Sequence, residues 1–264
     1  MKNTVLITGA AAGLGKSLSI ECARRGMDLV LADIDQVSTE KLARFLHRSY
    51  GVHAVSYSCD LSTIQGCIEL GNELAAAGIR LNILINNAGL GGTFGFEERS
   101  INQLVAQINL NVVAPTVLSR LFIPNLKSNG DAYVLNVASL AGFFHLAGKQ
   151  VYGASKAYLL SLSRSLRAEF AERNVSFSVL CPGGMNTNLE LTLKHRRCSW
   201  FARLSIMQPE NVAKFAIDGM LKRKELIIPG LMNRLMLMTA KFIPSSVSNR
   251  VSRAEMQRLM AQRA

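Results

Sequence analysis

The sequence predicts an α/β fold: a doubly wound, parallel, seven-stranded sheet with helices on both faces, contained in a single domain. Short apolar runs of β type alternate along the 264 residues with longer amphipathic stretches typical of helices. The strand-like runs are apolar throughout, which indicates a parallel sheet covered on both sides. No repeat, linker or low-complexity tract interrupts the alternation, and the 49% hydrophobic content allows a sizeable core.

The elements follow this alternation in order along the chain. Strands are expected over residues 4–8, 28–33, 54–60, 82–88, 132–139, 176–183 and 225–230. Helices are expected between them over residues 14–26, 38–49, 64–77, 101–127, 152–173 and 209–224. The last helix has Pro209 at its first position, where the missing N–H costs no hydrogen bond, followed by Glu210.

A glycine-rich stretch, "TGAAAGLG" at residues 8–15, joins the first expected strand to the first expected helix. Glycine allows positive φ and a close approach to the backbone. Backbone N–H groups at a helix start bind anions, so the stretch predicts a site for the phosphates of a dinucleotide. Its glycines, Gly9, Gly13 and Gly15, are spaced GxxxGxG, and a purely structural turn is the alternative.

Asp33 ends the second expected strand, 18 residues beyond Gly15. A carboxylate at this place accepts hydrogen bonds from the ribose hydroxyls of an adenosine and repels a 2′-phosphate. Ala12 stands where a basic residue would help to bind that phosphate. The combination favours NAD(H) as the cofactor, with NADP(H) as the second choice. The alternative for Asp33 is a cap on a strand–helix turn.

Tyr152 and Lys156 lie four residues apart in "VYGASKAYLL" and share one face of an expected helix. A free tyrosine has a pKa near 10, but a fixed ammonium nearby favours the phenolate and lowers that pKa. The pair therefore predicts an acid–base group that works near neutral pH. Ser139, 13 residues before Tyr152, ends a strand where its hydroxyl would reach a substrate oxygen.

These motifs together resemble the short-chain dehydrogenase/reductase family over residues 4–190. The glycine stretch resembles the TGxxxGxG loop of the family, "NNAG" (86–89) its sheet-stabilising motif, and "YGASK" its YxxxK motif. The resemblance implies a Rossmann fold and reversible hydride transfer between a nicotinamide and an alcohol or ketone.

The resemblance also implies catalytic roles. Tyr152 is expected to exchange the proton with the substrate oxygen, and Ser139 to orient that oxygen. Lys156 is expected to lower the pKa of Tyr152 and to hold the nicotinamide ribose. Asn111, a better match than Asn109 in "NLNVVAPTVLSR", is expected to support a water-linked proton path from Lys156.

The implied cofactor site combines several segments. Asp60 and Leu61 match the pair beside the adenine, and "PGGMNT" (182–187) resembles the PGxxxT segment over the nicotinamide. Asn86 and Asn87 are expected to tie strands together by hydrogen bonds. The implied cofactor-binding residues are Thr8, Gly9, Gly13, Leu14, Gly15, Asp33, Asp60, Leu61, Asn87, Ala88, Gly89, Tyr152, Lys156, Pro182, Gly183 and Thr187.

Two regions extend this pattern. Within the catalytic domain, residues 1–230, we expect a substrate lid over about 184–208, where basic residues stand among Leu, Trp200 and Phe201. That composition suggests a lipophilic or acyl-type substrate with an anionic group, and a solvated basic helix is the alternative. Residues 231–264 form an amphipathic basic extension, which suits a membrane surface, a dimer contact or a cover for the substrate mouth.

The net charge of +12 lies mostly near the carboxyl terminus, because residues 190–264 hold 14 of the 30 Lys and Arg but 5 of the 18 Asp and Glu. No nucleic-acid-binding motif accompanies them, so no nucleic-acid partner is expected. We expect a homodimer or homotetramer. The alternative to an enzyme is a non-catalytic dinucleotide-binding protein that acts through its basic tail on a membrane or a partner.

Cysteine and histidine residues point to no metal site and no disulfide scaffold. The five Cys include no CxxC pair, and the four His are scattered. No secretory signal or uninterrupted membrane-spanning run is visible, so a cytoplasmic protein is expected, with peripheral membrane contact through residues 231–264 as an option.

Overall fold

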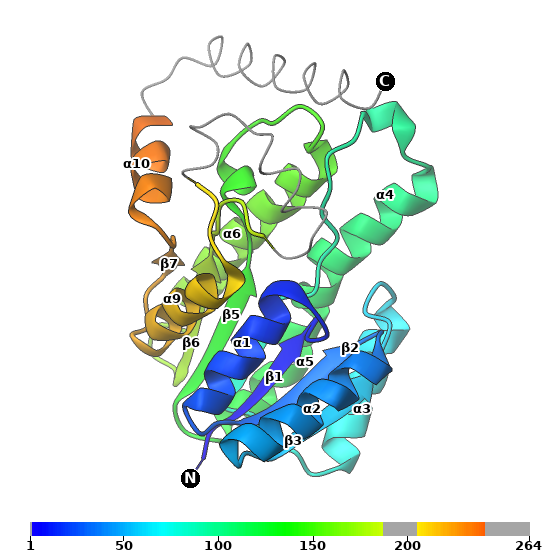
Figure 1. Cartoon of the computed structure of the whole chain (residues 1–264), viewed down its shortest axis with the longest axis vertical. Helices are drawn as coiled ribbons and strands as arrows, with labels where there is room; N and C mark the ends of the chain where they lie inside the picture. Colours follow the sequence, from blue (N-terminus) through cyan, green and yellow to red (C-terminus); the bar gives the residue numbers. More distant parts are fainter. Residues whose placement is uncertain (1, 187–204, 241–264) are drawn as a thin grey trace.

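A parallel sheet of seven strands forms the centre of the protein in a computed structural model that describes residues 2–186 and 205–240 (Figure 1). The strand order is β3-β2-β1-β4-β5-β6-β7. The chain therefore winds outward from β1 in one direction and, after β3, returns to place β4 on the other side of β1. The strands are β1 (Thr4–Thr8), β2 (Asp28–Asp33), β3 (Ala54–Ser58), β4 (Ile83–Asn86), β5 (Ala132–Val137), β6 (Val175–Leu180) and β7 (Leu226–Ile227).

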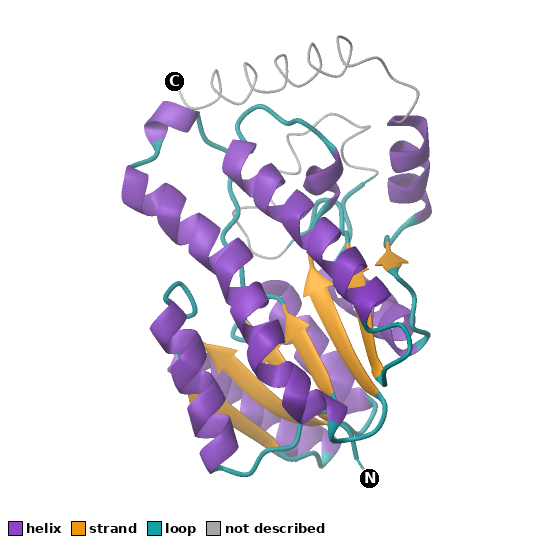
Figure 2. Ribbon diagram, turned by 180° about the vertical axis from the view of Figure 1, so that it is seen from behind, coloured by secondary structure: helices purple, strands orange, loops and turns teal. Residues whose placement is uncertain are grey.

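Helices cover both faces of the sheet, which confirms the predicted doubly wound fold (Figures 1 and 2). One face carries α1 (Gly13–Arg24), α2 (Gln36–Tyr50) and α9 (Pro209–Leu221). The other face carries α3 (Ile64–Ala76), α5 (Ala114–Lys127) and α6 (Gln150–Glu169). The remaining described helices are η1 (Phe96–Glu98), α4 (Ile101–Ile108), η2 (Asn109–Val113), η3 (Leu140–Phe143) and α10 (Leu231–Ala240).

The alternation of side chains along each strand builds two cores from one sheet. In β1, Val5 and Ile7 pack toward α1, α2 and α9, whereas Leu6 packs toward α3 and α5. All three side chains are fully buried. An almost wholly apolar strand is what a sheet covered on both faces requires.

Side-chain and glycine caps set several helix boundaries. Asp35 accepts a hydrogen bond from the Ser38 N–H at 3.0 Å at the start of α2, and Gly51 ends the same helix with φ of 65°. Thr63 caps α3 in the same way through the N–H of Gly66 at 3.0 Å. These caps satisfy orphan backbone groups, so the elements end close to where the sequence predicts.

Four strands, β3 to β6, end two or three residues earlier than expected, and two other elements differ more strongly from the expectation. The strand expected over 225–230 is reduced to Leu226–Ile227, because Pro229 cannot donate to a ladder and Gly230 adopts a φ of 85°. The helix expected over 101–127 is continuous, but Asn109–Val113 form one π-helical turn between α4 and α5. A π turn inserts one residue into the helical ladder and reorients the side chains around it.

The same run, Ile101–Lys127, is long and apolar enough to cross a membrane, with a mean hydropathy of 1.2 in its most apolar window. Among the described residues, no other helix is both long enough and apolar enough to cross a membrane. Its buried side chains, Leu118, Phe122 and Leu126, belong to the core under the sheet. A core helix of a globular domain meets the same length and composition, so these data give no reason to place it in a bilayer.

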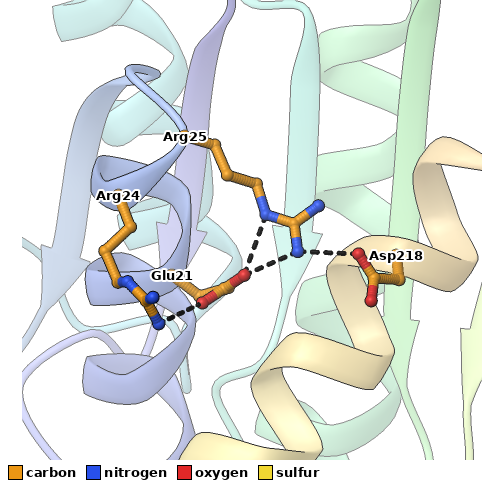
Figure 3. Close-up of polar contacts among 4 residues, drawn as sticks. All are labelled: Glu21, Arg24, Arg25 and Asp218. Atoms are coloured by element: carbon orange, nitrogen blue, oxygen red, sulfur yellow. Dashed lines mark hydrogen bonds and ion pairs between the residues drawn. The ribbon is translucent and has the colours of Figure 1, made fainter.

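An ion-pair network joins α1 to α9 at the edge of the first core (Figure 3). The Arg25 guanidinium donates to Glu21 at 2.6 Å and to Asp218 at 2.7 Å, and Arg24 reaches Glu21 at 3.4 Å. The Glu21 side chain is 11% exposed, whereas that of Asp218 is 44% exposed. Removing Arg25 therefore leaves the nearly buried Glu21 carboxylate paired only with Arg24, its more distant partner.

We expect Arg25→Met to lower the free energy of unfolding by about 2–3 kcal/mol, because breaking a buried pair strands a charge. Asp218→Asn is the matched control: it removes an exposed partner and is expected to cost about 1 kcal/mol or less. Urea unfolding followed by circular dichroism measures both. Equal losses of unfolding free energy in the two variants would contradict the argument that Arg25 stabilises the fold by neutralising the nearly buried Glu21.

Candidate active site

The predicted functional residues gather at the carboxyl ends of β1, β4 and β5. β1 lies between β2 and β4, and the direction of winding reverses between β1 and β4. In open α/β sheets this switch point leaves a crevice outside the strand ends, where ligands bind. The glycine loop after β1, the "NNAG" segment after β4 and Ser139 after β5 all lie at this crevice.

The glycine loop presents the start of α1 without a side-chain cap. Ala12 is the N-cap residue and its side chain makes no capping hydrogen bond. The first backbone bond into the helix is from Lys16 N–H to Ala12 C=O at 3.2 Å. The N–H groups of Gly13, Leu14 and Gly15 are therefore at the open end of the helix, where a phosphate is favoured.

Close packing explains why this loop needs its glycines. Gly9 and Gly13 have φ of 65° and 52°, in the left-handed region. A Cβ on Gly15 would lie 1.9 Å from the backbone oxygen of Gly9 and 2.7 Å from Nδ2 of Asn87. Any side chain at position 15 must therefore move the loop.

Thr8 and Asn87 lock the glycine loop to the end of β4. The Thr8 hydroxyl accepts hydrogen bonds from the N–H groups of Asn87 and Ala88, both at 3.0 Å. The Asn87 amide donates back to the carbonyls of Thr8 at 2.9 Å and Gly9 at 3.1 Å. The neighbouring Asn86 donates to Asn136 on β5 at 2.8 Å. Both asparagines thus tie strands together, as their motif implies.

The Asp33 carboxylate lies beside the glycine loop. Its Oδ2 accepts from Ala11 N–H at 2.9 Å and its Oδ1 from Asp35 N–H at 3.0 Å. Asp35 is the residue that caps α2, and the contact of Asp33 Oδ1 with Asp35 N–H is an Asx turn between β2 and α2, so Asp33 also caps the strand–helix turn as the alternative expects. The contact with Ala11 places a negative charge at the mouth of the phosphate loop.

The other predicted cofactor residues surround this crevice at their own strand ends. Asp60 and Leu61 follow β3; Asp60 is exposed and accepts Ser62 N–H at 2.9 Å, and Leu61 is buried. Pro182 follows β6 and accepts Leu140 N–H at 2.9 Å. A Cβ on Gly183 would lie 2.6 Å from the Ser205 carbonyl, so glycine is needed there. Thr187, and residues 187–204 of the expected lid with Trp200 and Phe201, lie outside the described residues.

Ser139, Tyr152 and Lys156 meet where β5 and the start of α6 come together. The Ser139 hydroxyl accepts Ala141 N–H at 3.1 Å and is within hydrogen-bonding reach of the Tyr152 phenol. The Lys156 ammonium donates to the Val137 carbonyl at 2.8 Å and lies 5.7 Å from the centre of the Tyr152 ring. The described part of the chain holds no cluster of His, Cys, Asp and Glu suited to a metal.

The pKa of Tyr152 departs from the expectation. Burial raises the pKa of this phenol, and its hydrogen bond with Ser139 lowers it by less. Lys156 does not contribute to this shift, and its Nζ donates to the Val137 carbonyl. Burial also lowers the pKa of Lys156 to about 8. The lysine therefore exchanges protons near physiological pH, although it does not make Tyr152 acidic by itself.

Asn111 sits inside the π turn and is fully buried. Its Oδ1 accepts Leu90 N–H at 2.8 Å, and its Nδ2 donates to the Leu90 carbonyl at 3.0 Å and to Ser155 at 3.1 Å. The position of a Cβ on Gly89 would be 3.0 Å from Asn111 Oδ1 and 3.4 Å from Lys156 Nζ. Asn111, and not Asn109, is thus joined to the neighbourhood of Lys156.

Sequence reasoning did not single out three polar residues around these groups. Ser155 accepts from Asn111 and donates to the Tyr152 carbonyl at 2.7 Å, and Gln107 donates to the Leu90 carbonyl at 3.0 Å. Lys149, whose ammonium lies 5.3 Å from the Tyr152 ring centre, precedes Tyr152 by three residues. That spacing places the two side chains on neighbouring positions of the helix start and is visible in the sequence.

Comparison with known proteins gives the same picture at the level of the family. A family model described as short chain dehydrogenase matches residues 3–197. The NADP-dependent 3-hydroxy acid dehydrogenase of Schizosaccharomyces pombe is 27% identical over 231 residues, which cover 85% of this chain and 89% of the relative.

Solved structures agree over most of the length. A short-chain dehydrogenase from Sphingobium yanoikuyae in complex with NADPH aligns with a TM-score of 0.77 at 29% identity, covering 98% of this chain and 95% of its own. A short-chain dehydrogenase/reductase from Burkholderia phymatum in complex with NAD aligns with a TM-score of 0.77 at 25% identity, covering 91% and 92%.

Proposed function

Because the chain belongs to the short-chain dehydrogenase/reductase family, we propose that Tyr152 is the acid–base group of a hydride transfer between a nicotinamide cofactor and an alcohol or ketone. The observation that carries the proposal is the meeting of Ser139, Tyr152 and Lys156 beside the glycine loop. Four separate segments of the chain converge there: the ends of β1, β4 and β5 and the start of α6.

The residues at the crevice fit a dinucleotide. The uncapped start of α1 offers backbone donors for a pyrophosphate, and Asp33 offers a carboxylate for ribose hydroxyls. Lys156 is buried beside Gly89, which supports its proposed contact with the second ribose. When bound, the nicotinamide accepts or supplies the hydride.

The proton is handled by residues of this chain. In the reductive direction the Tyr152 phenol donates its proton to the carbonyl oxygen, and in the oxidative direction the phenolate takes it from the hydroxyl. Ser139 donates to the same oxygen and orients it. Lys156, with a pKa of about 8, returns the proton to Tyr152. Asn111 holds the Leu90 backbone, and we assign to it the support of a water-linked proton path from Lys156.

An assay of reduced nicotinamide consumption against a panel of ketones and acyl substrates tests this function. We expect saturable turnover that depends on both cofactor and ketone. Saturable nucleotide binding without turnover of any panel member would favour the non-catalytic alternative. The lipophilic or acyl-type substrate stays a prediction, because most of the lid lies outside the described residues.

For the cofactor we propose NAD(H) over NADP(H). Asp33 places a negative charge beside Ala11, and Ala12 supplies no positive charge to offset it. The relative from Schizosaccharomyces pombe is NADP-dependent, and of the two similar structures described above one is a complex with NADPH and the other a complex with NAD, so the proposal rests on Asp33 alone.

Asp33→Ser is expected to weaken NADH binding about tenfold and to narrow or reverse the preference over NADPH, because a charged hydrogen-bond acceptor is lost. Asp35→Ser is the matched control: it removes a carboxylate two residues away and keeps a side chain that caps α2. Fluorescence titrations with each nucleotide measure both variants. Tighter binding of NADPH than NADH by the native chain would contradict the proposal.

We also propose how the protein assembles and where it lies in the cell. We propose association into a homodimer or homotetramer, with the groove between α5 and α6, lined by Thr116, Arg120, Ile123 and Leu166, as the candidate contact. Within the extension, α10 exposes Leu231, Leu235 and Met238 at helical spacing, which suits the predicted partner or membrane contact. We keep the prediction of a cytoplasmic protein, and light scattering and cell fractionation test these points.

A further inference from the structure

The first turn of α10 carries a buried amide that no step of the proposed mechanism uses. Asn233 is 1% exposed, whereas Leu231 and Met238 on the same helix are exposed. The helix follows β7 at the edge of the sheet (Figure 1). A buried amide is unfavourable unless it is hydrogen-bonded, so the contacts of Asn233 decide what it does.

The amide nitrogen of Asn233 joins two separate parts of the backbone. Its Nδ2 donates to the Pro229 carbonyl at 2.8 Å and to the Ser205 carbonyl at 3.3 Å. Pro229 lies in the turn between β7 and α10, and Ser205 lies in the stretch that leads into α9. Two carbonyl acceptors require the two N–H groups of an amide, so these contacts fix the orientation of the side chain.

The amide oxygen is consequently turned toward Gly183. Asn233 Oδ1 is buried and has no hydrogen-bond partner among the described residues. A Cβ on Gly183 would lie 2.8 Å from this oxygen and 2.6 Å from the Ser205 carbonyl. The backbone of Gly183 is therefore held between Asn233 and Ser205. An unpaired buried carbonyl lowers stability, so local stability gives no reason for an asparagine here, whereas a role at Gly183 does.

The segment after β6 is also paired with the residues before α9. Met207 N–H donates to the Gly184 carbonyl at 3.0 Å, and Asn186 N–H donates to the Met207 carbonyl at 3.4 Å. Nδ2 of Asn233 lies 3.9 Å from Sδ of Met207. The segment after β6, the stretch before α9 and the turn after β7 thus meet around one side chain, that of Asn233.

We propose that Asn233 is a positioning residue for the nicotinamide end of the cofactor and acts through Gly183. The inference deepens the proposed function and rests on it, because residues 182–187 are the segment implied to lie over the nicotinamide. With Asn233 in place, the backbone at Gly183 is ordered before the cofactor binds, and preordering of this kind strengthens binding. The adenosine end depends on the glycine loop and Asp33, so it should not respond to a change at Asn233.

The test compares NADH with ADP-ribose, which has the adenosine and the pyrophosphate but no nicotinamide. The variants are Asn233→Leu, which keeps the approximate shape and removes the amide, and Asn233→Ala, which cannot overfill the site. Asn82→Leu is the matched control at the other end of the sheet, where Asn82 accepts Thr4 N–H and donates to the Asn129 carbonyl, both at 3.1 Å. Calorimetric titration measures both dissociation constants, and urea unfolding measures the stability of each variant.

We expect both Asn233 variants to weaken NADH binding about tenfold and to leave ADP-ribose binding within about twofold, the effect of losing one well-placed hydrogen bond. Asn82→Leu is expected to lower stability and to leave the ratio of the two dissociation constants unchanged. Equal weakening of NADH and ADP-ribose, unweakened NADH, or an equal change of the ratio in Asn82→Leu overturns the inference and leaves the proposed function intact. A folded native chain that binds no NADH overturns the proposed function, and the inference with it.

Discussion

Tyr152→Phe is expected to lower kcat between about 10²- and 10⁴-fold while leaving nucleotide affinity unchanged, because only the phenolic proton is removed. The ring and its packing are kept, and the glycine loop that binds the phosphates is untouched. Burial raises the pKa of the Tyr152 phenol, so the protonated acid is the form present at neutral pH. The loss should therefore appear in carbonyl reduction at neutral pH as well as in alcohol oxidation.

Tyr158→Phe is the matched control for this change. Tyr158 lies on the same helix, is exposed, and its hydroxyl contacts Thr116 at 3.0 Å, away from Ser139. Its removal is expected to leave kcat and KM unchanged. A Tyr152→Phe variant that keeps native turnover of a true substrate would contradict the proposed acid–base role.

Gly15→Ala is expected to weaken nucleotide binding about 100-fold. The added Cβ would lie 1.9 Å from the Gly9 oxygen, so the loop must move. Its N–H groups would then no longer point at the phosphates. Loss of one or two charged hydrogen bonds, at about 1.5–3 kcal/mol each, accounts for that factor. Equilibrium titration with NADH measures the change.

Gly71→Ala is the matched control in the middle of α3. A Cβ at position 71 meets only the end of the Leu121 side chain, at 3.6 Å, an ordinary contact. Nucleotide affinity should be unchanged, and alanine should favour the helix. Equal nucleotide affinity in the two variants would mean that the glycine loop is only a structural turn.

Much of the sheet could be predicted from the sequence because burial on both faces leaves a strong pattern. β1 and β2 begin and end at the predicted residues, since each is an apolar run that stops at Gly9 or Asp33. β5 ends at Val137, earlier than the predicted 139, because Ser139 turns to start η3 and accepts Ala141 N–H. The residue at which a strand ends is decided by its hydrogen bonds with the neighbouring strand.

The π turn around Asn111 could not be predicted in the same way. The apolar pattern of residues 101–127 continues through it, and one inserted residue does not break that pattern enough to be noticed. The sequence motif selected Asn111 over Asn109, and the π turn gives the physical reason, since it brings Asn111 to Leu90 and Ser155.

The electrostatics of the site were the least predictable part. Spacing alone suggested that Lys156 lowers the pKa of Tyr152, but the effect depends on where the ammonium is held, and Val137 holds it. Distances across the fold, which no local pattern contains, set this result.

Titration of the purified native chain with NADH and NADPH, followed by nucleotide fluorescence, tests most directly whether this crevice is a nicotinamide site. Saturable binding is predicted, with NADH tighter, retained in Tyr152→Phe and lost in Gly15→Ala. Binding of neither nucleotide by a folded native chain would contradict the account at its base.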